Sequence, residues 1–160
     1  MEKEILSILE KDARQTAANI AVMLNSEESV IADIIASLEK RGIIRHYKTV
    51  IDWDKIGRDS VFAFIDVKVA PSRGVGFNEV ARRIYQYTEV HSVFLVSGDY
   101  DLRVVVEGST MQEVAFFVAE KLAPLKGVLS TRTNFLLKKY KEDGDIFEEP
   151  CEDSRLAVAP

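Results

Sequence analysis

The sequence has a single cysteine, Cys151, among its 160 residues, so no disulfide can form within one chain. It has no apolar run that approaches the ~20 residues a membrane-spanning helix needs. The first residues, Met1-Glu2-Lys3-Glu4, show neither the basic end nor the apolar middle of a secretion signal. Together these absences predict a cytoplasmic protein without a membrane partner.

Residues that carry common catalytic chemistry are also scarce. The two histidines, His46 and His91, fall in different predicted domains, and no cluster has the spacing of metal ligands. The sequence shows neither a nucleophile elbow nor a glycine loop that cradles phosphate. We therefore expect a protein that is not an enzyme and that holds no metal or cofactor.

Apolar sequence is present in an amount that suits a folded core. Hydrophobic residues make up 47% and charged residues 29% of the chain, which fits one medium domain or two small ones. The formal net charge of −5 arises mostly in residues 141–160, which hold seven acidic and two basic residues. We expect those residues to form a disordered or loosely docked acidic tail, and the nearly neutral remainder does not exclude nucleic acid as a partner.

Apolar residues at helical spacing predict short helices in residues 1–50. The first helix covers residues 2–11, and the second has Thr16 as its N-cap. Asn25 ends the second helix, because asparagine tolerates the left-handed conformation of a sharp turn.

A third helix is predicted to begin at Ser26, its expected cap, and to end at Gly42. Its buried face is expected to hold five aliphatic residues: Val30, Ile31, Ile34, Ile35 and Leu38. Three helices with a tight turn before the last describe a helix-turn-helix, whose third helix lies in a DNA major groove. The same spacing fits an ordinary three-helix unit equally well.

The pattern changes after residues 51–59, which break the periodicity and form a predicted linker. From Ser60 the apolar residues alternate as in a strand, and the turn Pro71-Ser72-Arg73-Gly74 ends that strand. The residues predicted to face the core share one parity: Val61, Ala63, Ile65, Val67 and Val69. The opposite face carries Phe62 and Phe64, and an exposed apolar face of this kind predicts a dimer closed by packing sheet against sheet.

The rest of residues 60–140 continues in the order helix, strand, strand, helix, strand. One helix covers 77–84, and the T-x-x-E capping box of Thr110 and Glu113 opens the other. A last strand runs from about 128 to 137. This order predicts a four-stranded antiparallel sheet with both helices on one face, the ferredoxin-like βαββαβ arrangement. The predicted fold class is therefore α+β.

The two middle strands are predicted to form a hairpin at the centre of the sheet. In residues 90–97, Val90, Ser92, Phe94 and Val96 alternate with His91, Val93, Leu95 and Ser97. The dipeptide Gly98-Asp99 suits a tight turn into the strand that begins at Leu102.

The order of these pieces resembles the Lrp/AsnC family of transcription regulators over residues 2–140. The pieces that carry the resemblance are Ile5 to Arg14, Leu38 to Ile44 with Tyr47 and Ile51-Asp52, and Ser97 to Leu102. The resemblance implies a winged-type DNA-binding domain and a ligand-sensing domain. It also implies dimers that assemble into octamers or open arrays, with a small effector, usually an amino acid, bound between dimers near the hairpin.

The third helix departs from that family, because its outward side carries Glu27, Glu28 and Asp33 where similar proteins show arginine or other donors. The side chains left to contact double-stranded DNA are basic or hydroxyl-bearing: Arg14, Ser26, Ser29, Ser37, Lys40, Arg41, Arg45 and Lys48. The alternative is an assembly or metabolite-binding protein whose degenerate helix-turn-helix no longer binds DNA.

The hairpin loop offers backbone N–H groups for a carboxylate and an acid for an ammonium, the two ends of an amino acid. The predicted effector-binding residues of this loop are Ser97, Gly98, Asp99, Tyr100 and Asp101. The resemblance adds the hydroxyls of Thr131 and Thr133. Simple turn chemistry at Asp99 and a packed ring at Tyr100 are equally good explanations of those two residues taken singly.

Overall fold

The computed structural model describes residues 1–57, 60–70 and 76–147 of the chain. It divides into two compact units, Met1–Ile51 and Asp52–Pro160. Parts of three expected features lie outside the described residues: the linker at 58–59, the turn at 71–74, and the tail at 148–160 with Cys151. Within the described ranges, no helix has the length and apolarity to cross a membrane.

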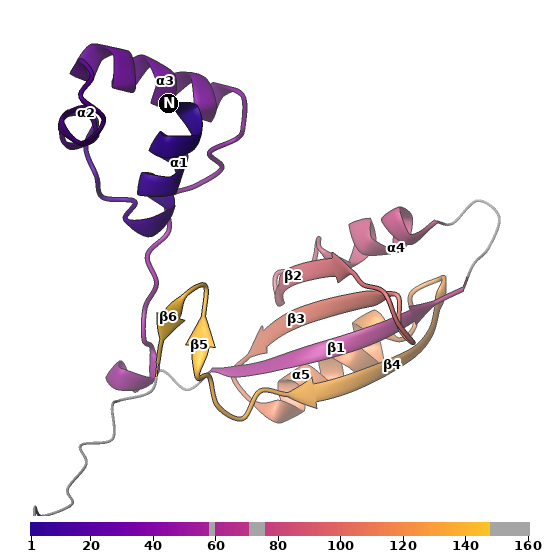
Figure 1. The fold of residues 1–160 in the computed structure, drawn as a ribbon. Helices are drawn as coiled ribbons and strands as arrows, with labels where there is room; N and C mark the ends of the chain where they lie inside the picture. Colours follow the sequence, from indigo (N-terminus) through magenta and orange to yellow (C-terminus); the bar gives the residue numbers. More distant parts are fainter. Residues whose placement is uncertain (58–59, 71–75, 148–160) are drawn as a thin grey trace, which may run out of the picture. The chain divides into compact units, whose positions relative to one another are not determined.

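The N-terminal unit consists of three helices, α1 (Glu2–Lys11), α2 (Ala17–Leu24) and α3 (Glu28–Lys40) (Figure 1). Thr16 caps α2 as predicted, because its Oγ1 accepts from the Asn19 N–H at 3.2 Å. Asn25 ends α2 with φ of 49°, in the left-handed conformation that the sequence predicted.

Two details of the third helix were predicted wrongly. Ser26 does not cap α3, because Glu27 occupies the N-cap position and the Ser26 N–H instead donates to the Ala21 carbonyl at 2.9 Å. Val30 is 41% exposed and lies outside the apolar core. The buried residues of this unit share an aliphatic character: Ile5, Leu9, Ile20, Ala21, Ile31 and Leu38.

The C-terminal unit has the predicted ferredoxin-like fold. Its four-stranded antiparallel sheet has the strand order β2-β3-β1-β4. The strands and helices follow in the order β1 (Val61–Val69), α4 (Phe77–Ile84), β2 (Val90–Leu95), β3 (Leu102–Gly108), α5 (Met111–Phe117) and β4 (Val128–Phe135). A short 3-10 turn, Asp54–Ile56, precedes β1, and a π-helical turn, Val118–Leu122, extends α5.

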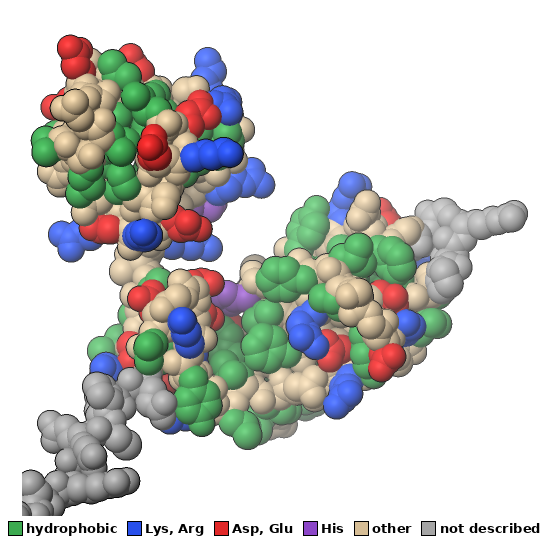
Figure 2. All heavy atoms as spheres, in the orientation of Figure 1, with side chains coloured by type: hydrophobic (Ala, Val, Ile, Leu, Met, Phe, Trp, Pro, Cys, Tyr) green, Lys and Arg blue, Asp and Glu red, His purple; other side chains and the backbone are tan. Residues whose placement is uncertain are grey.

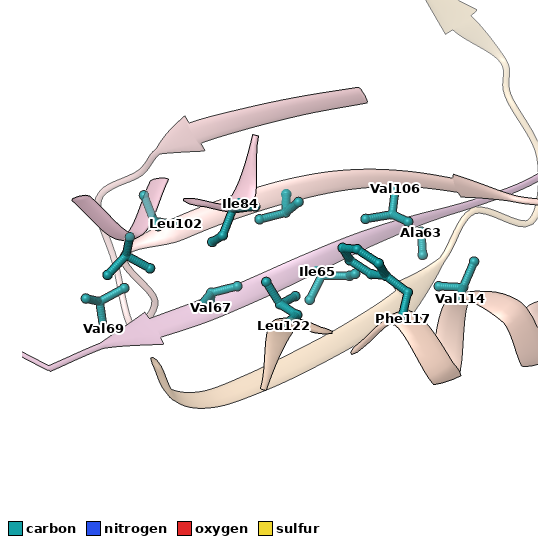
Figure 3. Close-up of a cluster of buried hydrophobic side chains, with 12 residues drawn as sticks. Ala63, Ile65, Val67, Val69, Ile84, Leu102, Val106, Val114, Phe117 and Leu122 are labelled. Carbon is teal, nitrogen blue, oxygen red and sulfur yellow. The ribbon is translucent and has the colours of Figure 1, made fainter. Parts of the chain in front are cut away.

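Buried side chains of both helices, among them Ile84 of α4 and Phe117 of α5, pack with those of β1 and β3 into one core on one face of the sheet (Figure 3). Alternate residues of β1, from Ala63 to Val69, point to that face, as their spacing predicted. The capping box of α5 forms with one change: the Glu113 N–H donates to Thr110 Oγ1 at 3.1 Å, while the Glu113 carboxylate accepts from the Ser109 N–H at 2.7 Å.

The predicted alternation of β2 is wrong, because its register shifts by one residue between Val90 and Ser92. Val90 and Val93 both pack against the core, whereas strict alternation placed them on opposite faces. A β-bulge of this kind inserts one unpaired residue and reverses the faces beyond it.

The connection from β2 to β3 is longer than the predicted tight turn. The strands end at Leu95 and restart at Leu102, and the Val96 N–H donates to the Asp101 carbonyl at 2.9 Å. Gly98 has φ of 133°, a conformation that favours glycine. We call Ser97–Asp101, the residues predicted to bind an effector, the effector loop.

The expectation of an unstructured tail from residue 141 is also corrected. Two short strands, β5 (Lys141–Glu142) and β6 (Asp145–Ile146), pair antiparallel through a turn at Asp143 and Gly144. The Phe147 N–H donates to the Tyr140 carbonyl at 3.0 Å and closes this hairpin. Three of the acidic residues that led to the expectation, Glu142, Asp143 and Asp145, are exposed on this hairpin, where they remain hydrated.

Candidate DNA-binding and effector sites

The exposed side of α3 lies opposite its buried residues. Ile31 and Leu38 are fully buried, so residues about half a helical turn away face outward. Exposed side chains recur there every three or four residues: Ser29, Asp33, Ala36, Ser37 and Lys40. We call these five the outer stripe of α3.

Basic side chains occur in the last turn of α3 and in the segment that follows it. Lys40, Arg45 and Lys48 are exposed, and none of them forms an ion pair with a residue that the structure describes. Arg41 is different, because its guanidinium donates to the Glu2 carboxylate of α1 at 2.7 Å. The first three therefore remain available to phosphates, whereas Arg41 would have to exchange its partner.

The other two predicted DNA contacts lie at the turns beside α2. Arg14 is exposed in the α1–α2 turn, where its N–H donates to the Asp12 carboxylate at 3.0 Å. Ser26 is half-buried in the α2–α3 turn.

The segment after α3 forms neither helix nor strand in residues 45–52. The Tyr47 hydroxyl donates to the Glu39 carboxylate at 2.8 Å and holds this segment against α3. Burial, and then the adjacent Glu39 carboxylate, raise the pKa of Tyr47, so the hydroxyl keeps its proton. The contact was not foreseen, because Tyr47 lies beyond the end of α3, where helical spacing no longer relates it to Glu39.

Asp101 fastens the effector loop to β1. Its N–H donates to the Val67 carbonyl at 3.1 Å, and its Oδ2 accepts from the Val69 N–H at 2.8 Å. Lys68 Nζ lies 3.6 Å from the same carboxylate oxygen. One end of the loop is therefore held firmly, and a cation that the sequence reasoning missed stands beside it.

The rest of the loop is open to solvent. Ser97, Gly98 and Asp99 are exposed, and Tyr100 is half-buried. The loop thus presents a hydroxyl, a free carboxylate and peptide groups on a fixed base, which are the groups that recognise an amino acid.

The two predicted threonines do not lie equally close to this loop. Thr131 pairs with Val67, and Val67 pairs on its other side with Leu102, so Thr131 lies across β1 from the residue that follows the effector loop. Thr133 lies two residues further along β4, opposite Ile65. Within one chain, Thr131 therefore lies closer to the effector loop than Thr133 does, with β1 between Thr131 and the loop.

The sheet face opposite the helices, which we call the open face, mixes aromatic and charged side chains (Figure 2). Asp66 lies at its centre, only 6% exposed, and accepts from Arg103 Nε at 2.8 Å and Asn134 Nδ2 at 3.4 Å. The hydrogen bond to Asp66 raises the pKa of Arg103. Pairing of β1 with β3 sets Asp66 opposite Arg103, a register that no local sequence pattern reveals.

The comparisons with known proteins agree with these two units. Residues 62–146 match the Lrp/AsnC ligand binding domain, and residues 1–45 match a winged helix-turn-helix DNA-binding domain. The two units therefore define a helix-turn-helix transcriptional regulator with a ligand-binding domain. The chain belongs to the Lrp/AsnC family, whose members are transcriptional regulators and not enzymes.

Individual relatives extend along nearly the whole chain. The uncharacterized HTH-type transcriptional regulator YugG of Bacillus subtilis is 50% identical over 160 residues, which cover 99% of this chain and 96% of the relative. The HTH-type transcriptional regulator FL11 of Pyrococcus horikoshii is 30% identical over 146 residues, with coverages of 91% and 93%.

A solved structure shares the fold at lower identity. The transcriptional regulator of Neisseria meningitidis in complex with L-methionine has a TM-score of 0.72 and 22% identity, and the match covers 94% of this chain and 95% of that one. A feast or famine regulatory protein of Mycobacterium tuberculosis, complexed with L-methionine, matches with a TM-score of 0.73 and 20% identity over 88% and 92% of the two chains.

Proposed function

We propose that this regulator binds duplex DNA through its N-terminal unit and a free amino acid through the effector loop, at a junction with another copy of itself. The observation that carries the proposal is the anchoring of Asp101 to β1, which presents Ser97, Gly98 and Asp99 outward on a rigid base. Two regulators of the same fold were solved with L-methionine, which supports an amino acid as the class of effector.

The test of the sensing half is a thermal-shift screen of the common amino acids with the full chain. A ligand at a hundred times its dissociation constant stabilises the native state by about 2.7 kcal/mol, a shift that is easily measured. Asp99→Asn should abolish the shift, and Asp143→Asn, an exposed turn acid far along the sequence, should preserve it. No shift with any amino acid at millimolar concentration would overturn the amino-acid assignment.

Self-association through the open face is the second part of the proposal. This face carries Phe94, 53% exposed, beside half-buried Phe62 and Phe64, and exposed apolar surface of this kind is commonly covered by a partner. We expect a homodimer at least, and an octamer as the higher assembly. Phe94→Glu should lower the sedimentation coefficient, whereas Met111→Glu, a position on α5 with 54% exposure, should not.

The second candidate is an assembly or metabolite-binding protein whose helix-turn-helix no longer binds DNA. The acids Glu28 and Asp33 on the exposed side of α3 favour it, since like charges repel phosphates. An anisotropy titration of the full chain against its own upstream region, at low and moderate salt, separates the two. Binding that weakens steeply with salt supports the regulator, and no binding at low salt supports the second candidate.

A further inference from the structure

The outer stripe of α3 carries an unusual set of side chains for reading bases. Its first three turns present Ser29, Asp33, Ala36 and Ser37, and its one cation, Lys40, stands at the last residue of the helix. Arginine and lysine are the usual readers of guanine, and asparagine and glutamine the usual readers of adenine. Before Lys40, the outer stripe holds none of these four residue types.

Asp33 occupies the middle of the outer stripe, and its side chain is exposed to solvent. Its carboxylate makes no hydrogen bond or ion pair with the residues that the structure describes. Two charged neighbours are engaged, since Glu39 accepts from the Tyr47 hydroxyl and Arg41, the C-cap residue, donates to Glu2. Glu28 and Lys40, at the two ends of α3, form no ion pair with the described residues. An uncommitted carboxylate at the centre of a recognition surface has acceptor oxygens only.

The major-groove edges of the bases decide what such a carboxylate can recognise. Cytosine presents its N4 amino group as a donor, whereas guanine presents the acceptors N7 and O6. Adenine offers a donor at N6 together with an acceptor at N7, which suits an amide better than a carboxylate. The hydroxyls of Ser29 and Ser37, one turn before and one turn after Asp33, donate or accept and so tolerate several bases.

The negative charge of Asp33 also disfavours binding to DNA sites that lack a suitable hydrogen-bond donor. Lys40 lies seven residues from Asp33, about 10 Å along the helix axis, which exceeds the Debye length of about 8 Å in physiological salt. Asp33 is therefore not neutralised by its own helix, and it repels a groove that offers no donor. Attraction by the right base and repulsion by the others together set specificity.

We infer that Asp33 is the residue that determines base specificity in this regulator, and that it accepts a hydrogen bond from the N4 amino group of a cytosine in each half-site. The inference rests on the proposed binding of DNA by the N-terminal unit. It also predicts that the guanine paired with that cytosine contributes nothing to the contact through its N7.

The test selects binding sites from a pool of randomised duplexes with the full chain, and then measures anisotropy for all four base pairs at each enriched position. For the natural chain, cytosine at one position of each half-site should be preferred over adenine by about tenfold. Asp33→Asn should reverse that preference toward adenine, because asparagine reads adenine bidentately. The control Glu10→Gln removes an exposed acid from α1 and should keep the cytosine preference.

A second measurement separates the two strands of the same base pair. Replacing the paired guanine by 7-deazaguanine removes N7 and leaves cytosine N4 intact, so affinity should not change. Loss of affinity with 7-deazaguanine would overturn the inference. A uniform rise in affinity for all duplexes with Asp33→Asn, at unchanged base preference, would also overturn it, because Asp33 would then only repel phosphate. Absence of all binding at low salt would instead overturn the proposed binding of DNA itself.

Discussion

The two units of this regulator bury very different amounts of apolar surface. The clustered core of the N-terminal unit has five buried residues, all on helices, whereas the C-terminal core has twelve, shared by a sheet and two helices. Hydrophobic stabilisation grows with the apolar area removed from water, so the sheet unit has the larger reserve of stability. We therefore expect the helical unit to unfold more easily than the sheet unit.

The largest expected effect comes from breaking the small core. Ile31→Ala removes a fully buried side chain and should cost about 2–5 kcal/mol, enough to unfold the N-terminal unit and abolish duplex binding. Ile65→Ala makes the same change in the sheet and should lower its melting temperature without unfolding it. Calorimetry of the full chain measures both. A single transition that moves equally in the two variants would contradict the independence of the units.

The next effect concerns a feature of the sheet unit alone. Among the described residues, Asp66 is the buried charged side chain, and Asp66→Ala removes the acceptor of Arg103 and one of two acceptors of Asn134, which also donates to the Phe64 carbonyl. We expect a loss on the order of 2 kcal/mol from the C-terminal transition, measured by chemical denaturation. Arg103→Gln should cost less, because the Arg103 side chain is 49% exposed and water replaces its bond. Equal losses would show that the pair acts only as a unit.

Two matched caps sharpen the comparison at a smaller scale. Thr16 caps α2 and Thr110 caps α5 through the same bond, in which the N–H three residues later donates to the threonine Oγ1. Replacing either by alanine should cost about 1 kcal/mol. The same loss should lower the melting temperature more in the N-terminal unit, because the shift scales inversely with the unfolding entropy of the unit. Calorimetry that finds the larger shift in the sheet unit would refute the ranking of the two cores.

The smallest effect depends on pH. A hydrogen bond from Lys121 is the main reason that the pKa of Glu89 lies below its ordinary value. A lowered carboxylate pKa stabilises the fold above the unfolded value, and this contribution is lost as the pH falls through the folded value. Glu89→Gln should therefore cost under about 1 kcal/mol near pH 7, and nothing once the pH lies below the folded value, in parallel thermal melts. If Glu89→Gln remained less stable than the natural chain in acid, the loss would come from packing and not from the charge of Glu89.

Local chemistry was the part of the fold that could be predicted from the sequence. Thr16, Asn25 and Thr110 act within three or four residues of themselves, and the alternation in β1 reports its own buried face. These signals need no partner strand. They were sufficient to order the elements and to predict the ferredoxin-like arrangement.

Features that depend on pairing were missed for a physical reason. The bulge between Val90 and Ser92 reverses the faces of β2, and it is fixed by contact with β3 rather than by composition. The Asp66–Arg103 pair likewise follows from the register of β1 and β3. The strands β5 and β6 stabilise each other in a segment whose charge alone suggested disorder.

The candidate sites show the same division. The effector loop is continuous in sequence, so its five residues could be proposed together, whereas Lys68 joins it only through the register of β1. The predicted DNA contacts were chosen for charge and hydroxyl groups. Asp33 was set against DNA binding on the same ground, although its central place on the outer stripe makes it the natural candidate to read a base.

The bulge in β2 also bears on how copies of this chain avoid aggregation. β2 is an edge strand of the sheet, and an edge with a regular row of free peptide groups invites another chain to extend the sheet. The bulge between Val90 and Ser92 interrupts the regular spacing of the free peptide groups, so the groups of a straight incoming strand cannot align with them. At the opposite edge β4 carries Arg132 between Thr131 and Thr133, and an exposed charge there discourages fibrillar stacking in the same way. Both edge strands of the sheet, β2 and β4, thus disfavour the addition of strands from other chains.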